Sequence, residues 1–282
     1  MKCFIDYDGT LATDNGIVNS ENLLFLRKHS ESFVLVTGRS LAEINRIFNE
    51  KLFKIDAIGG NGSFIYKNNH IQILSTLDRM SIIKILVYLR KYNFPILLHT
   101  VKGTYLFVDY CNNSKALCKE RLENIAREYA NKILHVCDVS NELYELYYDT
   151  FFKIPIGQCH LDDLKKLKYV TSIEIFYDSS EEKRIFKNFL NKFGQVTESY
   201  YTSMEFNGAA TKGTAVETYI KNNKINFSFS IGNGLNDESM FIKTNVAFRM
   251  AGTNQNLSAI ELPFTPLDPF LPEIYECEDN KL

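Results

Sequence analysis

The sequence predicts an α/β fold: a doubly wound parallel sheet with an α+β domain inserted into it. Short apolar strands alternate with amphipathic helices near both ends of the chain, which is typical of a parallel sheet with helices on both faces. Turns rich in Gly, Asp and Thr follow these strands, where ligands bind in such sheets. The middle of the chain mixes hairpins with helices instead, which indicates a separate folding unit.

The first part of the chain shows the alternation clearly. Cys3, Phe4 and Ile5 form a short apolar run, and Ser40 with Glu43 forms a capping box that starts a helix. The expected elements are strands at 3–5, 33–36 and 56–58, helices at 20–29 and 40–48, and a hairpin-like stretch that ends at 66.

The same rhythm returns late in the chain. Lys212 opens a helix in which Thr214 and Glu217 match a second capping box, a strand follows at 227–231, and another helix begins at Glu238. The tail from Pro263 onward holds four of the six prolines, so a surface extension is expected there.

Between these parts the pattern is different. The expected elements are helices at 80–92, 114–129 and 180–193, with strands at 94–100, 103–110 and 173–177. We therefore predict a core built from residues 1–77 and 195–282, with a separately folded α+β domain inserted at 78–194.

Composition excludes several classes of protein. The 282 residues carry 32 basic and 34 acidic side chains, and this near-neutral balance argues against a bulk nucleic-acid binder. No apolar run approaches the ~18 residues of a membrane span, and the six cysteines form no C-x-x-C pair. We expect a cytoplasmic protein without nucleic-acid or membrane partners; its oligomeric state cannot be read from the sequence.

Two acids follow the first strand in the run Asp6-Tyr7-Asp8-Gly9-Thr10. A turn that begins at Tyr7 can bring both carboxylates to one pocket, where one attacks as a nucleophile and the other transfers a proton. A solvated Asp-x-Asp-Gly turn without chemistry is the alternative, and this motif alone leaves it open.

Two further motifs suit a phosphate group. Thr37-Gly38-Arg39 ends a strand and precedes a helix, so it offers a hydroxyl and free backbone N–H groups. Lys212 begins a helix and could hold a phosphoryl group beside the two acids. An ordinary turn and a solvated lysine are the alternatives.

The last motif supplies oxygen ligands. Asn233, Asn236 and Asp237 lie in a glycine-containing loop after a strand, which suits a hard cation such as Mg²⁺. The alternative is a turn that only reverses the chain.

In their order and spacing, these four motifs resemble those of the haloacid dehalogenase (HAD) superfamily. The stretch 58–63 and the large insertion resemble its Cof-type sugar-phosphatase branch. The resemblance covers roughly 150 residues of the core, and it implies a Rossmann-like sheet. Within the insertion the resemblance is only topological, and it implies that residues 78–194 form a cap that selects the substrate.

The resemblance also implies a mechanism. Asp6 would be the nucleophile that attacks a phosphomonoester, and Asp8 the general acid and base. Mg²⁺ would lie between the Asp6 carboxylate, the Asp8 carbonyl and Asn233, with Asp237 nearby or through water.

Supporting roles follow from the same resemblance. Thr37, the Gly38 N–H and Lys212 would hold the transferring oxygens, with help from Arg39. Thr10 and Asn236 would support the site. Asn61 is a candidate substrate contact, although a turn role is equally open.

One position departs from the family pattern, which usually has Asp where this chain has Asn233. The loss of one negative charge predicts weaker Mg²⁺ binding. It also keeps two rivals open: a catalytically weak protein that binds a phosphorylated metabolite for regulation, and a phosphosugar mutase.

The sequence does not identify the small phosphorylated metabolite, for which a sugar phosphate is the first choice. Candidate cap contacts are His99, Lys102, Tyr105, Tyr147 and His160, and for each a packed or solvated role is the alternative.

Overall fold

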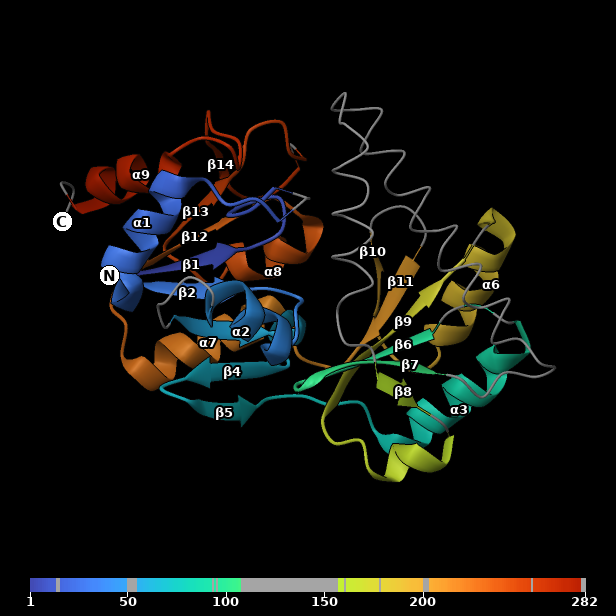
Figure 1. The fold of residues 1–282 in the computed structure, drawn as a ribbon. Helices are drawn as coiled ribbons and strands as arrows, with labels where there is room; N and C mark the ends of the chain where they lie inside the picture. Colours follow the sequence, from blue (N-terminus) through green and yellow to red (C-terminus); the bar gives the residue numbers. More distant parts are fainter. Residues whose placement is uncertain are drawn as a thin grey trace. The chain divides into compact units, whose positions relative to one another are not determined.

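The chain folds into two units, each built around its own sheet (Figure 1). The computed structural model describes residues 1–13, 16–49, 55–92, 94, 96–107, 157–159, 161–177, 179–199, 203–254 and 256–279. The first unit combines residues 1–74 with 210–282, and the second consists of 75–209. The expected helix at 114–129 and the candidate residues Tyr147 and His160 lie outside the described residues.

The first unit contains an eight-stranded sheet in the order β14-β13-β12-β1-β2-β3-β4-β5. All neighbours from β14 to β3 are parallel, whereas β4 and β5 add an antiparallel hairpin at one edge. The strands are β1 (Lys2–Asp6), β2 (Phe33–Val36), β3 (Asp56–Gly59), β4 (Phe64–Lys67), β5 (His70–Ile73), β12 (Ser228–Gly232), β13 (Val246–Arg249) and β14 (Ile260–Glu261). Successive strands run outward from β1 in one direction and from β12 in the other, so the topological switch point lies between β1 and β12.

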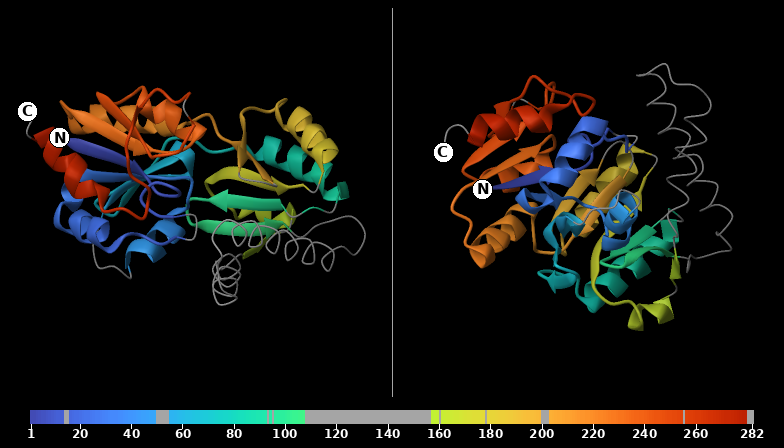
Figure 2. Two further views of the ribbon diagram at one scale, coloured as in Figure 1. Left: turned by 90° about the horizontal axis from the view of Figure 1, so that it is seen from above. Right: turned by 60° about the vertical axis from the view of Figure 1, so that its left-hand side comes forward.

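Helices cover both faces of this sheet, as expected for a doubly wound fold (Figure 2). They are α1 (Ser20–Lys28), α2 (Leu41–Asn49), α7 (Lys212–Asn223), α8 (Glu238–Phe241) and α9 (Phe270–Asp279), with 3₁₀ turns η1 (Ser30–Ser32), η2 (Gly60–Gly62) and η5 (Leu235–Asp237). Val216 and Tyr219 of α7 pack with Val34 on one face, and Phe48 of α2 packs against Tyr7 on the other. In the described part of the chain, no helix has the length and apolar character needed to cross a membrane.

The start of α7 differs from its predicted capping. Lys212 does open the helix, but the capping box is formed by Thr211 and Thr214 rather than by Thr214 and Glu217. The Thr211 N–H donates to the Thr214 hydroxyl at 2.9 Å, and the Thr214 N–H donates to the Thr211 hydroxyl at 3.1 Å. The prediction was wrong by three residues because the pair that caps the helix ends in Thr214 and so lacks the Glu or Gln of the usual pattern, which Thr214 and Glu217 match one turn later.

The tail is not the surface extension that its prolines suggest. Phe270, Leu271 and Ile274 of α9 are buried, and the Leu271 N–H donates to the Asn22 side chain at 3.0 Å. Pro272 lies in the first turn of α9, where a residue without an N–H costs no helical hydrogen bond.

Within the described residues, the second unit contains a six-stranded sheet in the order β10-β11-β9-β6-β7-β8, antiparallel except for the β7–β8 pair. Its strands are β6 (Ile96–Thr100), β7 (Gly103–Phe107), β8 (Gly157–Cys159), β9 (Val170–Phe176), β10 (Val196–Ser199) and β11 (Ser203–Asn207). The helices α3 (Arg79–Leu89) and α6 (Ser180–Leu190) pack on one face, and the 3₁₀ turns are η3 (Arg90–Tyr92) and η4 (Leu161–Lys165). This α+β arrangement agrees with the expected class of the insertion.

The second boundary of the insertion lies later than predicted. The predicted core includes residues 195–209, but β11 pairs with β9 and β10 pairs with β11, so both strands belong to the sheet of the second unit. Met204 and Phe206 complete the apolar core of that sheet. The crossing therefore falls at 209/210, just before α7.

Candidate active site

The turn after β1 exposes one acid and buries the other. Asp6 ends β1 with 5 % of its surface exposed, whereas Asp8 is exposed. The turn is closed by hydrogen bonds from the N–H groups of Thr10 and Ala12 to the Tyr7 carbonyl. Gly9 has a φ of +74°, a backbone conformation that L side chains rarely adopt. The turn therefore separates the two carboxylates into different surroundings.

A buried lysine joins two carboxylates at the switch point. The Lys212 ammonium donates to Asp6 Oδ1 at 2.6 Å and to Asp237 Oδ1 at 2.7 Å, and all three side chains are at most 7 % exposed. Asp6 comes from the end of β1, Lys212 from the first residue of α7, and Asp237 from the turn that follows β12. Asp6 and Asp237, which lie 206 and 25 positions from Lys212 in the sequence, thus meet it at one edge of the sheet.

Burial and the neighbouring charges shift the pKa values of Asp6 and Lys212. The pKa of Asp6 is raised to about 7, first by burial and then by repulsion from Asp237, against the opposing effect of Lys212. Burial alone would lower the pKa of Lys212, but the charges of Asp237 and Asp6 raise it above its ordinary value. Lys212 therefore stays charged, and Asp6 is a carboxylate that is only partly compensated.

Asp237 also organises the loop after β12. Its Oδ2 accepts from the N–H groups of Asn233 and Gly234, both at 2.9 Å, while its Oδ1 accepts from Lys212. Both carboxylate oxygens therefore have protein donors. Asp237 holds Lys212 and the backbone of the loop in place together.

Asn233 lies against the turn that carries the acids. Its side-chain oxygen accepts from the Thr10 hydroxyl at 3.3 Å, and its amide nitrogen would come within 2.1 Å of a Cβ added at Gly9. A side chain at position 9 would therefore displace the Asn233 amide. The exposed Asn236 lies on the same loop, with its side-chain oxygen over Gly234.

Asp8 is paired with Arg39. The guanidinium donates through Nε to Asp8 Oδ2 at 3.1 Å and through Nη2 to Oδ1 at 2.7 Å, a bidentate ion pair. The sequence predicted that Arg39 holds phosphate oxygens, and this role stays a prediction. The sequence showed no sign of the pair itself, because nothing in local spacing links positions 8 and 39.

The loop after β2 is braced by the loop after β3. The Asn61 N–H donates to the Thr37 carbonyl at 3.1 Å, and the Asn61 side chain lies against Gly38. Gly62, at a φ of +100°, packs so closely on Thr211 that an added Cβ would meet its carbonyl at 2.1 Å. Thr37 is buried, and Gly38 is exposed.

The oxygen atoms that could act as metal ligands fit a hard cation such as Mg²⁺. Asp6 Oδ2 accepts no hydrogen bond from any described residue, and the Asn233 side-chain oxygen accepts only from Thr10 among them. No group of three or more His, Cys, Asp or Glu side chains in the described ranges could hold a metal. One carboxylate with an amide oxygen suits Mg²⁺, which usually keeps several waters and binds few protein ligands.

The predicted core residues thus lie together in the first unit, from Asp6 and Thr10 through Thr37 and Lys212 to Asp237. The cap candidates that are described belong to the second unit. There His99 hydrogen-bonds Glu174 at 3.1 Å and Thr104 at 3.0 Å.

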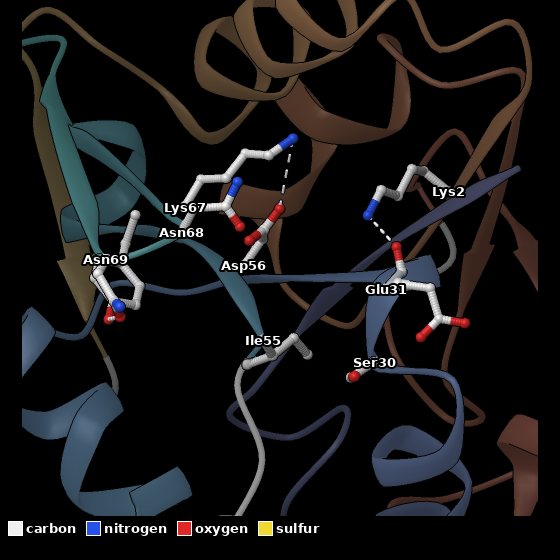
Figure 3. Close-up of a pocket in the computed structure, with 9 residues that line it drawn as sticks. Lys2, Ser30, Glu31, Ile55, Asp56, Lys67, Asn68 and Asn69 are labelled. Carbon is white, nitrogen blue, oxygen red and sulfur yellow. Dashed lines mark hydrogen bonds and ion pairs between the residues drawn. The ribbon is translucent and has the colours of Figure 1, made fainter.

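A cavity of about 310 Å³ lies elsewhere in the first unit (Figure 3). It is lined by Lys2 and Asp56, which begin β1 and β3, so it opens at the amino ends of the strands, opposite Asp6. Its charged groups face protein partners: Lys2 donates to the Glu31 carbonyl, and Lys67 lies 3.9 Å from Asp56. This internal pairing makes the cavity a weaker candidate than the switch-point site.

Comparisons with known proteins identify the family and agree with the fold. The family model of the haloacid dehalogenase-like hydrolases matches residues 3–262. A haloacid dehalogenase-like hydrolase from B. subtilis is structurally similar with a TM-score of 0.75 and 19 % identity, over 95 % of this chain and 96 % of that one. A HAD superfamily phosphatase from Bacteroides thetaiotaomicron has a TM-score of 0.69 and 15 % identity, over 98 % and 94 % of the two chains. A sugar phosphatase of HAD subclass IIB has the same TM-score of 0.69 and 14 % identity, over 99 % of both chains. No curated protein sequence matches this chain.

Proposed function

The chain belongs to the haloacid dehalogenase-like hydrolase family, and from that premise we propose that it is a Mg²⁺-dependent phosphomonoesterase. Its substrate would be a small phosphorylated metabolite. A sugar phosphate is the first choice because a structurally similar protein is a sugar phosphatase.

The state of Asp6 carries this proposal. One oxygen is held by Lys212, while Oδ2 accepts no hydrogen bond from the described residues. Burial and Asp237 raise the pKa of this carboxyl to about 7, so its negative charge is poorly stabilised and suited to attack. A purely structural carboxylate would have both oxygens satisfied, as Asp237 has.

The proposed reaction has two steps. Asp6 attacks the phosphorus, the ester P–O bond breaks, and the leaving alkoxide takes a proton from Asp8. Water then attacks the phosphorus of the aspartyl-phosphate while the Asp8 carboxylate takes its proton, which releases inorganic phosphate and restores Asp6.

The neighbouring groups would hold the phosphoryl oxygens. The Thr37 hydroxyl, the exposed Gly38 N–H and the Lys212 ammonium supply donors and positive charge. Asp6, the Asp8 carbonyl and Asn233 would hold Mg²⁺, which neutralises negative charge at the phosphoryl group when bound. We assign Asp237 to fixing Lys212 and the loop, since both of its oxygens already have protein donors.

The test is phosphate release from a panel of sugar phosphates, nucleotides and pyridoxal phosphate with Mg²⁺. Asp6→Asn keeps the shape of the side chain and removes the nucleophile, so it is expected to abolish release. Activity that survives in Asp6→Asn would rule out Asp6 as the nucleophile.

Asn233 favours a second candidate function. An amide in place of an acid leaves one carboxylate, Asp6, in the proposed cation site, so a protein that binds a phosphorylated metabolite with weak catalysis is the alternative. Binding of panel compounds without turnover would favour this alternative. A phosphosugar mutase would be identified by an isomeric product in place of inorganic phosphate.

A further inference from the structure

The two acids of the first turn are held in different ways. Asp6 is buried and fixed by Lys212, whereas the Asp8 side chain is 47 % exposed. Among the described residues, Arg39 is the side chain that hydrogen-bonds the Asp8 carboxylate, and it reaches both oxygens. The orientation of Asp8 therefore depends on Arg39.

Arg39 is itself held from two other sides. Its guanidinium lies 5.1 Å from the centre of the Tyr7 ring, and Tyr7 is buried. A second acid, Glu43, lies 3.9 Å from Nη1. Arg39 is thus a fixed group and not a solvated side chain that reaches Asp8 by chance.

The contacts that hold Arg39 extend into helix α2 through Glu43. Glu43 accepts from the Ser40 N–H at 2.8 Å and from its hydroxyl at 2.7 Å, and this capping box starts α2. A series of contacts thus leads from the helix cap through Glu43 and Arg39 to Asp8. Such support is what precise placement of a catalytic group requires, because small displacements weaken proton transfer.

We propose that Arg39 is the positioning residue for Asp8 and therefore determines how well the enzyme cleaves esters with poor leaving groups. This inference rests on the proposed phosphatase function. As the P–O bond breaks, the Asp8 proton passes to the leaving oxygen, and the remaining carboxylate stays in the Arg39 fork. Arg39 acts through Asp8 and does not need to touch the phosphoryl group.

Leaving-group dependence separates this role from direct phosphate binding. An alkyl ester such as glucose 6-phosphate needs a proton on its leaving oxygen, whereas the phenolate of p-nitrophenyl phosphate leaves without one. Because general acid catalysis contributes about 10²–10⁴-fold, Arg39→Gln should lower kcat/KM at least about 10-fold for the alkyl ester and less than about threefold for the aryl ester. The ratio of the two rates in one sample does not depend on the fraction of folded protein.

Three further variants sharpen the test. In kcat/KM, which covers the steps through departure of the leaving group and not the later hydrolysis that Asp8 also assists, Asp8→Asn should show the same selective loss. The double variant Asp8→Asn/Arg39→Gln should lose little more kcat/KM than Asp8→Asn alone, since residues that act as a unit are not additive. Arg39→Lys keeps the charge but loses the two-pronged contact, so it should recover part of the alkyl activity.

The outcomes are distinguishable. Equal losses on both esters in Arg39→Gln, or additive losses in the double variant, would overturn the positioning role and indicate direct phosphate contact. If the wild type hydrolyses neither ester nor any compound of the panel, the proposed function fails, and the inference fails with it.

Discussion

Each unit of the molecule contains a buried or half-buried acid held by a basic side chain, and the two acids differ in one respect. In the second unit, Glu174 accepts from Ser203 at 2.7 Å through one oxygen and pairs with His99 at 3.1 Å through the other. In the first unit, Asp6 has Lys212 on one oxygen, and none of the described residues donates to the other.

The pKa values of the two acids differ in the same way as their hydrogen bonds. Burial would raise the pKa of Glu174, but the hydrogen bond and charge of His99 bring it below its ordinary value. The pKa of Asp6 is raised to about 7, because burial and Asp237 outweigh Lys212. Glu174, with both oxygens paired, stabilises the fold, whereas Asp6, with one oxygen left open, is suited to chemistry.

The largest expected effect comes from removing the positive charge of the buried Lys212 in the first unit. Lys212→Met would leave Asp6 and Asp237 buried without a compensating charge, which should cost about 3–5 kcal/mol in the free energy of unfolding of that unit. Urea denaturation measures this cost. Lys221→Met on the same helix is the control: its exposed pair with Glu217 should contribute less than about 1 kcal/mol. Equal effects in the two variants would contradict a special role for the buried triad.

The turn that keeps the two acids apart should be the next most sensitive feature. Gly9 and Gly16 both have a φ of +74°, but an added Cβ at Gly9 meets Asn233 at 2.1 Å, and one at Gly16 meets nothing within 4 Å. Both alanine variants carry the cost of the left-handed backbone, so their difference isolates the crowding. Gly9→Ala should be less stable than Gly16→Ala by about 1–3 kcal/mol and should lose phosphate release. Similar unfolding curves would show that the turn yields without strain.

The residue at position 233 should affect how tightly Mg²⁺ binds beside Asp6. Asn233→Asp restores an acid beside Asp6, and it should lower the half-saturating Mg²⁺ concentration about tenfold, or roughly 1.4 kcal/mol. Mg²⁺ binding measured by calorimetry checks this expectation apart from turnover. Equal half-saturation in the two proteins would contradict it.

The smallest effect is expected at the satisfied acid of the second unit. Because the folded-state pKa of Glu174 lies below the ordinary 4.5, its stabilisation is fully present above that pH and is lost as the pH falls through the folded-state value. Glu174→Gln should therefore cost about 1 kcal/mol at pH 7 and less in acid. Urea denaturation at pH 7 and at pH 4 measures the difference, with the exposed Glu181→Gln as control. A cost that does not fall with pH would mean that the charge of Glu174 contributes nothing.

Much of the fold could be predicted because apolar runs and helix caps are local signals. The strands at Phe33–Val36 and the capping box of Ser40 and Glu43 agree with the structure. The errors lie where tertiary contacts dominate. Val196–Ser199 and Ser203–Asn207 are short strands with polar residues. The first pairs with the second, the second pairs with β9, and neither pairing has a local signal. The proline-rich tail forms α9 because it packs against α1.

Which residues could meet follows from the sequence. Motifs after parallel strands must share the carboxyl edge of the sheet, as Asp6 and Asp237 do, and Lys212 reaches the same edge because it begins the helix that leads into β12. The partners of these side chains depend on the tertiary structure. Asp237 is occupied by two backbone N–H groups as well as Lys212, and Arg39 turns to Asp8. The reason is physical: strand order fixes where a backbone ends, while the direction of each side chain depends on donors and charges supplied by distant parts of the chain.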